Sequence, residues 1–308
     1  MKYIAFLDTV HESLDKTLSE KGFECIAAEE ISKHQILMGE FDWHGIVIRS
    51  RFRIDKEIID ALPDLKFIAR FGAGMENIDV EYAESKGIKC LRAPEGNMTA
   101  VAEQTLGMLL SLTNRLFIAR EEVRNGIWKR EENRGIEIEG KTVGIVGYGF
   151  MGKALAQRLK AFGCRILVND PYLEIKEEGI EQVTIEELQK ETDILSLHLP
   201  LSEETQAFVN TDFINKMAKP FLLINTARGN HVVSEDLLAG LKSGKVVAAC
   251  LDVLDREKSS FEHAVQDETI KELLALENVL ITPHIAGWTH ESNYKMAAAL
   301  YQKIMAIN

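Results

Sequence analysis

The sequence predicts an α/β protein made of two parallel-sheet domains. The chain has 308 residues, of which 46% are hydrophobic and 27% charged, an ordinary globular composition but more chain than one core usually organises. In both halves, short apolar runs bounded by turn residues alternate with segments of helical spacing, as in parallel strands joined by helices. A glycine-rich turn directly after one apolar run adds a nucleotide-binding signature. We therefore expect two doubly wound sheets.

The first hundred residues contain four candidate buried strands, at 3–7, 45–48, 66–69 and 88–91. Segments of helical spacing separate them, most clearly at 54–62 and 80–86. The order strand, helix, strand predicts one α/β unit.

A long apolar helix is predicted at 99–124, because its spacing is helical and Asn125-Gly126 provides a stop signal. A second series of apolar runs then predicts strands at 143–146, 165–169, 193–199, 221–225, 246–251 and 279–281. The last helix, 290–307, is followed by no strand, and we expect it to return and pack on the first domain.

Two helices of the second series have recognisable starts. Thr184 stands three residues before Glu187, the spacing of a capping box, and Ser234 precedes an acidic first turn. Both positions are predicted helix N-termini.

Charge and cysteine spacing exclude several classes of protein. A net charge of −12 argues against a nucleic-acid partner or an anionic membrane surface. The first apolar run meets Asp8 too early for a signal sequence, and no run reaches membrane-spanning length. Without a CxxC pair or clustered His, the scattered cysteines predict reduced thiols in a cytoplasm and no metal site: Cys25, Cys90, Cys164 and Cys250.

The strongest site signal is a G-x-G-x-x-G turn between a strand and a helix, formed by Gly147, Gly149 and Gly152. The first glycine permits the tight turn, the second lets the backbone approach a pyrophosphate, and the third lets helix and strand pack closely. Asp170, at the end of the next strand, can accept ribose hydroxyl groups and would repel a 2′-phosphate, which favours NAD over NADP. A purely structural turn is the alternative.

Polar residues follow several predicted strands of the second domain, where parallel sheets bind ligands. Arg228 could hold a carboxylate with its planar fork, or serve only as a surface ion-pair partner. His284 is a candidate acid/base, with Glu257 as its candidate carboxylate partner. Spacing alone does not choose Glu257 over the neighbouring acids Asp255, Glu262 and Asp267.

These motifs resemble the D-isomer-specific 2-hydroxyacid dehydrogenases, and among them the D-3-phosphoglycerate dehydrogenases. The resemblance spans nearly the whole chain and rests on residues 72–79, 102–103, 147–152, 225–229, 251–253 with Glu257, and 283–287. It implies hydride transfer between NAD and C2 of a small anionic 2-hydroxy or 2-oxo acid.

The resemblance also implies roles for individual residues. Arg228, Glu257 and His284 would form the catalytic set. Cofactor contacts would fall on Gly147, Gly149, Phe150, Met151, Gly152, Asp170, Pro200, Thr226, Ala227, Asp252 and Gly287. The substrate would meet Arg49, Arg70 and the backbone of Ala73 and Gly74.

The family fold is discontinuous. It implies a flavodoxin-like substrate-binding domain from residues 1–98 and 285–308, with a Rossmann NAD-binding domain, 99–284, inserted between the two segments. It also implies a homodimer formed through about residues 99–140 and, for a chain of this length, no regulatory domain.

Two positions depart from the family pattern. Lys258 stands where a proline commonly follows the glutamate, and Trp288 stands where phosphoglycerate dehydrogenases usually have a small residue. Trp288 would either reshape the substrate pocket or pack at the domain junction.

Phosphoglycerate is the first substrate expected, with reduction of glyoxylate or hydroxypyruvate second. A nucleotide-sensing corepressor that binds peptides is an alternative of another class, because one fold can serve several functions.

Overall fold

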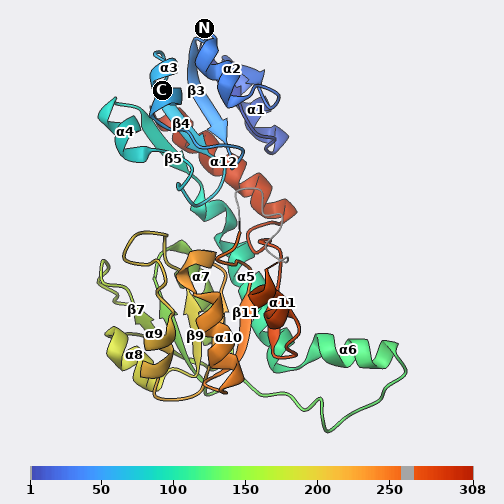
Figure 1. The fold of residues 1–308 in the computed structure, drawn as a ribbon. Helices are drawn as coiled ribbons and strands as arrows, with labels where there is room; N and C mark the ends of the chain where they lie inside the picture. The colour runs from blue at the N-terminus through green and yellow to red at the C-terminus, as the bar shows by residue number, and fades with distance from the viewer. Residues whose placement is uncertain (1, 258–266, 308) are drawn as a thin grey trace. The chain divides into compact units, whose positions relative to one another are not determined.

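The computed structural model describes residues 2–257 and 267–307. The chain forms two compact units, Met1–Thr99 with Trp288–Asn308 (unit 1) and Ala100–Gly287 (unit 2) (Figure 1). The predicted boundaries lay at 98 and 284, whereas the units change at 99 and 287.

Unit 1 contains a five-stranded parallel sheet with the order β2-β1-β3-β4-β5, which is the flavodoxin-like order. The strands are β1 (Lys2–Phe6), β2 (Phe23–Ala27), β3 (Trp43–Ile48), β4 (Phe67–Arg70) and β5 (Lys89–Arg92). Four of them match predicted strands, and β2 was not predicted.

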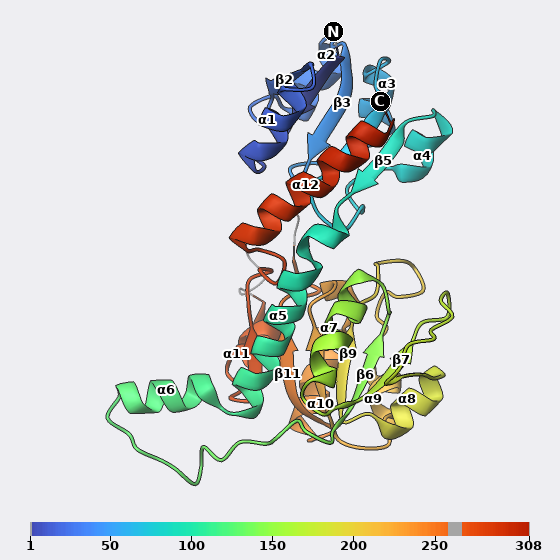
Figure 2. The same cartoon turned by 180° about the vertical axis from the view of Figure 1, so that it is seen from behind.

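Helices cover both faces of this sheet. On one face lie α1 (Glu12–Ser19) and α12 (His290–Ile307), and on the other lie α2 (Lys33–Met38), α3 (Lys56–Ala61) and α4 (Val80–Ser85) (Figure 2). Helix α12 buries Met296, Ala297, Leu300 and Ile304 against α1 and the sheet. The predicted return of the last helix to the first domain is confirmed.

Unit 2 contains a seven-stranded parallel sheet with the order β12-β11-β10-β9-β6-β7-β8, which is the Rossmann order extended by one strand. Its strands are β6 (Thr142–Val146), β7 (Arg165–Asn169), β8 (Ile180–Gln182), β9 (Ile194–Leu197), β10 (Phe221–Asn225), β11 (Val246–Leu251) and β12 (Val279–Ile281). All six predicted strands are present, and β8 was not predicted.

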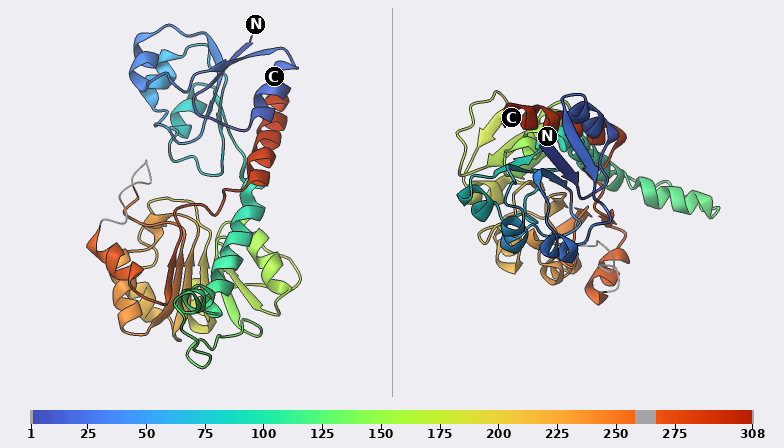
Figure 3. Two further views of the ribbon diagram at one scale, coloured as in Figure 1. Left: turned by 90° about the vertical axis from the view of Figure 1, so that its right-hand side faces the viewer. Right: turned by 90° about the horizontal axis from the view of Figure 1, so that it is seen from above.

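The core on one face of this sheet receives side chains from α8 (Ile185–Glu191), α9 (Thr211–Lys216), α10 (Ser234–Lys242) and α11 (Glu268–Leu274). Helices α5 (Pro94–Thr113) and α7 (Phe150–Lys160) lie on the opposite face (Figures 2 and 3). Both predicted doubly wound sheets are confirmed.

The helices α5, α8 and α10 differ in how well their ends were predicted. The predicted helix 99–124 is two helices, because Arg115 adopts a left-handed conformation (φ 53°) between α5 and α6 (Leu116–Arg124). Thr184 and Glu187 form the predicted capping box. Ser234 is not the N-cap of α10, since Val233 holds that position and the Ser234 hydroxyl instead donates to Asp255 (2.6 Å).

Helix α6 and residues 125–141 extend away from the rest of unit 2 (Figures 1 and 2). Exposed apolar side chains occur along this extension: Leu116, Val123, Ile127, Trp128 and Ile136. Within residues 2–257 and 267–307, no helix has the length and apolar character needed to cross a membrane.

Candidate active site

The glycine turn of unit 2 has the geometry of a dinucleotide loop. Gly147 adopts φ 90°, and a Cβ on it would lie 2.5 Å from the carbonyl oxygen of His198. A Cβ on Gly152 would lie 2.1 Å from the Gly147 oxygen, so helix α7 could not approach the turn with any larger residue. A Cβ on Gly149 would meet no protein atom within 4 Å. The turn is therefore tight inside and open outside, which is where a pyrophosphate needs room.

Asp170 lies at the end of β7 beside this turn. Its Oδ2 accepts the Tyr148 N–H (2.8 Å), and its Oδ1 accepts the Tyr172 N–H (3.0 Å). The Tyr172 hydroxyl donates to Glu204 on the loop after β9 (2.9 Å). The carboxylate is thus held at the point of the sheet where an adenosine ribose is bound in this fold.

Phe150 and Met151 begin α7, and the Phe150 side chain is 48% exposed beside the open side of the turn. Pro200 follows β9, and its carbonyl accepts the Thr205 hydroxyl (2.7 Å). Gly287, another predicted cofactor contact, is the last residue of unit 2.

The loop after β10 is tied down by its own hydrogen bonds. The buried Asn225 side chain accepts the Ala227 N–H (3.1 Å) and donates to the Arg228 carbonyl (2.8 Å). The Thr226 hydroxyl lies 2.9 Å from that of Thr105 on α5. Arg228 Nη1 donates to the Ala227 carbonyl (2.7 Å), so the arginine is fixed in place just beyond the strand.

Gly229 brings this loop against the loop after β11. A Cβ at Gly229 would lie 1.9 Å from the Leu254 carbonyl oxygen, so the two loops pack without space for a side chain. The Leu254 N–H donates to Glu257 Oε1 (2.6 Å). Arg228 and Glu257 are therefore carried by neighbouring, mutually packed loops.

Glu257 and His284 form a direct pair. His284 Nδ1 lies 2.8 Å from Glu257 Oε2, and the two side chains are 34% and 17% exposed. The other carboxylates have different partners, because Asp255 binds Ser234 and Asp267 caps α11. Geometry thus selects Glu257, which spacing could not; Lys258 and Glu262 lie outside the described residues.

His284 has a positive φ (56°), which is uncommon for a residue with a side chain. Its N–H donates to the Asp252 carbonyl (2.9 Å). The Asp252 side chain is 1% exposed and accepts from the Thr282 hydroxyl (2.5 Å) and the N–H groups of Ile285 (2.9 Å) and Ala286 (2.8 Å). Burial raises the pKa of this carboxyl, since water no longer stabilises its charge.

Asp252 therefore acts inside the protein, as the residue that holds the turn carrying His284. Its contact with the cofactor stays a prediction. Strained backbone held by such a network is often found at functional sites.

In unit 1, Arg49 follows β3, and its guanidinium lies 3.5 Å from the ring centre of Trp288. Arg70 ends β4, with Nη1 donating to the Phe71 carbonyl (3.3 Å), and Ala73 and Gly74 follow in the next loop. Trp288 is 58% exposed and contacts Arg49, and its role in the substrate pocket or at the domain junction stays a prediction.

Two supporting residues were not predicted from the sequence. Asp8 Oδ2 accepts the N–H groups of Arg49 (2.7 Å), Ser50 (3.1 Å) and Arg51 (3.2 Å) and so fixes the loop after β3. Thr282 binds Asp252. Asp8 is the second residue after β1, and a carboxylate near a strand's carboxyl end was the available signal.

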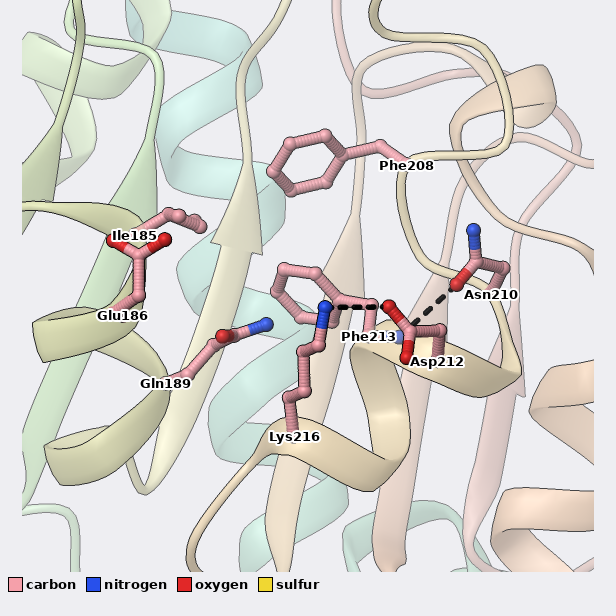
Figure 4. Close-up of a pocket in the computed structure, with 8 residues that line it drawn as sticks. All are labelled: Ile185, Glu186, Gln189, Phe208, Asn210, Asp212, Phe213 and Lys216. Carbon is pink, nitrogen blue, oxygen red and sulfur yellow. Dashed lines mark hydrogen bonds and ion pairs between the residues drawn. The ribbon is translucent and has the colours of Figure 1, made fainter.

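A hollow of about 290 Å³ lies elsewhere, between α8 and α9 (Figure 4). Phe208 and Phe213 line it together with an ion pair between Lys216 and Asp212 (2.7 Å). None of the predicted site residues lines it. In the described part of the chain, no group of His, Cys, Asp or Glu side chains is arranged to hold a metal ion.

Residues 106–286 match the family "D-isomer specific 2-hydroxyacid dehydrogenase, NAD binding domain". A hydroxypyruvate reductase of Thermotoga maritima is 36% identical over 96% of both chains. A D-3-phosphoglycerate dehydrogenase of Methanocaldococcus jannaschii is 35% identical over all of this chain but only 57% of its own length.

Among solved structures, D-lactate dehydrogenase from Aquifex aeolicus, complexed with NAD and lactic acid, superposes with a TM-score of 0.82 at 26% identity, covering 99% of this chain and 95% of that one. Sheet order, glycine turn and sequence similarity agree over nearly the full length. The chain belongs to the D-isomer specific 2-hydroxyacid dehydrogenase family.

Proposed function

We propose that Arg228, Glu257 and His284 interconvert a D-2-hydroxy acid and its 2-oxo acid, with 3-phosphoglycerate and 3-phosphohydroxypyruvate as the preferred pair. The observation that carries the proposal is the 2.8 Å contact between His284 and Glu257 on the turn held by Asp252. An oriented imidazole is the group best suited to exchange a hydroxyl proton near neutral pH.

Arg228, His284 and Glu257 have different roles in the proposed reaction. Arg228 holds the substrate carboxylate through its planar donors. His284 Nε2 takes the C2 hydroxyl proton during oxidation and returns it during reduction, while Glu257 orients the ring through Nδ1. The residues of the glycine turn and Asp170 fit NAD, which when bound accepts the hydride from C2 and returns it in reduction.

Phosphoglycerate leads because Arg49 and Arg70 supply positive charge at the strand ends of unit 1, in a protein that is acidic overall. Hydroxypyruvate reduction is the second candidate. Similarity to the Thermotoga hydroxypyruvate reductase favours this second candidate, because the match covers 96% of that protein. The match to the Methanocaldococcus phosphoglycerate dehydrogenase covers only 57% of that protein.

The test is NADH formation with 3-phosphoglycerate, beside NADH oxidation with 3-phosphohydroxypyruvate, hydroxypyruvate and glyoxylate. His284→Ala should lower turnover by roughly 10²- to 10⁴-fold while NADH binding, followed by fluorescence, is unchanged. Retained turnover would remove His284 from this role. Absence of turnover with every acid in the wild type would instead support a nucleotide-sensing binding protein.

We also propose a homodimer in which α6 and residues 125–141 contact the partner, since apolar side chains such as Trp128 (79% exposed) lie along this extension. A monomeric mass by light scattering would refute it.

A further inference from the structure

The backbone around Arg49 is fixed in an unusual way. One carboxylate oxygen of Asp8 accepts three consecutive N–H groups, from Arg49, Ser50 and Arg51. The Arg51 guanidinium binds the backbone of unit 1, since Nη1 donates to the carbonyls of Ala28 (3.3 Å) and Ile31 (2.9 Å). Arg51 is therefore held by backbone carbonyls, whereas the Arg49 guanidinium lies over the ring of Trp288.

The Arg49 guanidinium is stacked on Trp288 rather than paired with an acid. It lies 3.5 Å from the indole ring centre, well inside the range of a cation–π contact. Burial lowers its pKa, although Asp8 opposes this shift. Among the described residues, no carboxylate lies within ion-pair distance of the Arg49 guanidinium. The nearby Asp8 uses Oδ2 to accept backbone N–H groups. A partly buried cation without an ion pair is complementary to an anion.

Trp288 has the features of a residue placed for this contact. Its side chain is 58% exposed, so it adds little to the core. The next residue, Thr289, exchanges hydrogen bonds with Ser292 at the start of α12 (both 3.0 Å), which fixes the backbone beside the indole. The ring lies against the face of the guanidinium, whereas the N–H donors of a guanidinium lie along its edge.

Arg49 lies at an edge of the unit 1 sheet where a substrate could bind. Arg49 stands at the carboxyl end of β3, beside the end of β4, because the Phe71 N–H donates to the Ile48 carbonyl (2.8 Å). Ligands of parallel α/β sheets bind at this edge. Trp288 follows the candidate acid/base His284 by four positions in the sequence.

We propose that Trp288 is a specificity-determining residue, which holds the Arg49 guanidinium edge-on so that it reads a negatively charged group on the far end of the substrate. The inference rests on the proposed function and names the feature of the substrate that is selected. An acid with a C3 phosphate gains two parallel N–H···O contacts, whereas the same acid with a C3 hydroxyl gains one neutral contact.

The test compares two ligand pairs that differ only in the phosphate. The Kd values of 3-phosphoglycerate and D-glycerate are measured by calorimetry in the presence of NADH, and kcat/KM is measured for 3-phosphohydroxypyruvate and hydroxypyruvate. The selectivity is the ratio within each pair. Ratios cancel changes in the catalytic groups and in cofactor binding, which affect both members equally.

Trp288→Ser should lower both ratios by about 5- to 30-fold, mainly through the phosphorylated member, because the guanidinium loses its platform. Trp288→Phe should retain most of the selectivity. Arg49→Lys should behave like Trp288→Ser, since an ammonium keeps the charge but not the planar fork. Arg53→Gln, which removes an exposed neighbouring charge, is the control for net charge and should leave the ratios within about twofold.

Unchanged ratios in Trp288→Ser, or a wild type that does not prefer the phosphorylated member by calorimetry, would overturn the inference. The proposed function can fail independently of this inference. A wild type that binds 3-phosphoglycerate selectively but turns over neither oxo acid would support phosphate recognition by Arg49 and Trp288 and refute the proposed reaction. Turnover of both oxo acids with equal kcat/KM, together with equal Kd values for 3-phosphoglycerate and D-glycerate, would support the proposed reaction and refute phosphate recognition by Arg49 and Trp288.

Discussion

Replacing Asp252 by Asn tests whether the turn that carries His284 is held by a buried charge. In the wild type, both carboxylate oxygens accept: one from Thr282 and Ile285, the other from Ala286. An amide has only one accepting oxygen, so one backbone N–H must face an NH₂ group whichever way the amide is turned. The Thr282 hydroxyl can rotate and accept, but a backbone N–H cannot.

Two effects of this change oppose one another in stability. The unsatisfied buried N–H costs about 1–3 kcal/mol. Removing the charge relieves the desolvation that raises the pKa of Asp252, and this offsets the loss. We therefore expect the free energy of unfolding to change by no more than about 1 kcal/mol at neutral pH. The positive φ of His284, which costs about 1–3 kcal/mol, is no longer fully compensated, so kcat/KM should fall by about 10- to 100-fold.

The assay combines urea unfolding with initial rates of NADH oxidation. The sign of the pH effect follows from the raised pKa: the folded protein binds a proton more readily than the unfolded chain, whose carboxyl has its usual value of 3.8, so lower pH favours the folded state. Wild type should thus gain stability relative to Asp252→Asn as pH falls from 7 toward 4. Thr282→Val, which leaves both Asp252 oxygens to accept the N–H groups of Ile285 and Ala286, is the matched control and should lose less activity. Wild-type kcat/KM in Asp252→Asn would refute the reasoning.

Other changes should separate folding from chemistry. Gly152→Ala should unfold at lower urea concentration, because its Cβ meets a backbone oxygen, whereas Gly149→Ala should fold normally and bind NADH more weakly; equal stability losses would contradict this. Burial lowers the pKa of His198 to about 4, so as pH falls the unfolded chain binds the proton before the folded protein does. The free energy of unfolding should therefore decrease between pH 6.5 and 4, by up to about 3 kcal/mol and by less because the ring is partly exposed. An equal decrease in His198→Gln, measured by urea unfolding, would contradict this assignment. Glu257→Gln should lower kcat by about 10- to 100-fold while Asp255→Asn stays within about twofold, and the reverse order in initial rates would exchange their roles.

Most strands were predictable because they are buried on both faces and read as apolar runs. The two that were not, β2 and β8, are both edge strands. In β2 the alternation is weak, with Glu24 exposed, and β8 has only three residues, of which Glu181 and Gln182 are exposed. A half-solvated edge needs no continuous apolar run, so the pattern gives little signal there.

The break between α5 and α6 was missed for a different reason. Leu112 and Leu116 continue the helical spacing across the junction, and no Gly or Pro marks it. Arg115 adopts its left-handed conformation with its side chain bonded to Asn133 (3.3 Å) and Glu277 (3.0 Å). Those partners lie 18 and 162 residues away, so local sequence carries no trace of them.

For the site, single residues at strand ends were predictable and their partners were not. Glu257, Asp255 and Asp267 are equivalent by spacing, and only the three-dimensional arrangement assigns His284 to one of them. The stack of Trp288 on Arg49 joins residues 239 positions apart (288 − 49), which no local pattern reports.

The discontinuity of unit 1 has a consequence for biosynthesis. Helix α12 supplies Met296, Leu300 and Ile304 to a core whose other side chains belong to the first hundred residues. While the ribosome adds residues 100–287, the α1 face of that sheet lacks this apolar cover, yet unit 2 is continuous and can close its own core. Domains generally fold as units during synthesis. The nascent chain should therefore complete its second unit before its first, and during that interval the uncovered face is the surface that a chaperone would need to protect.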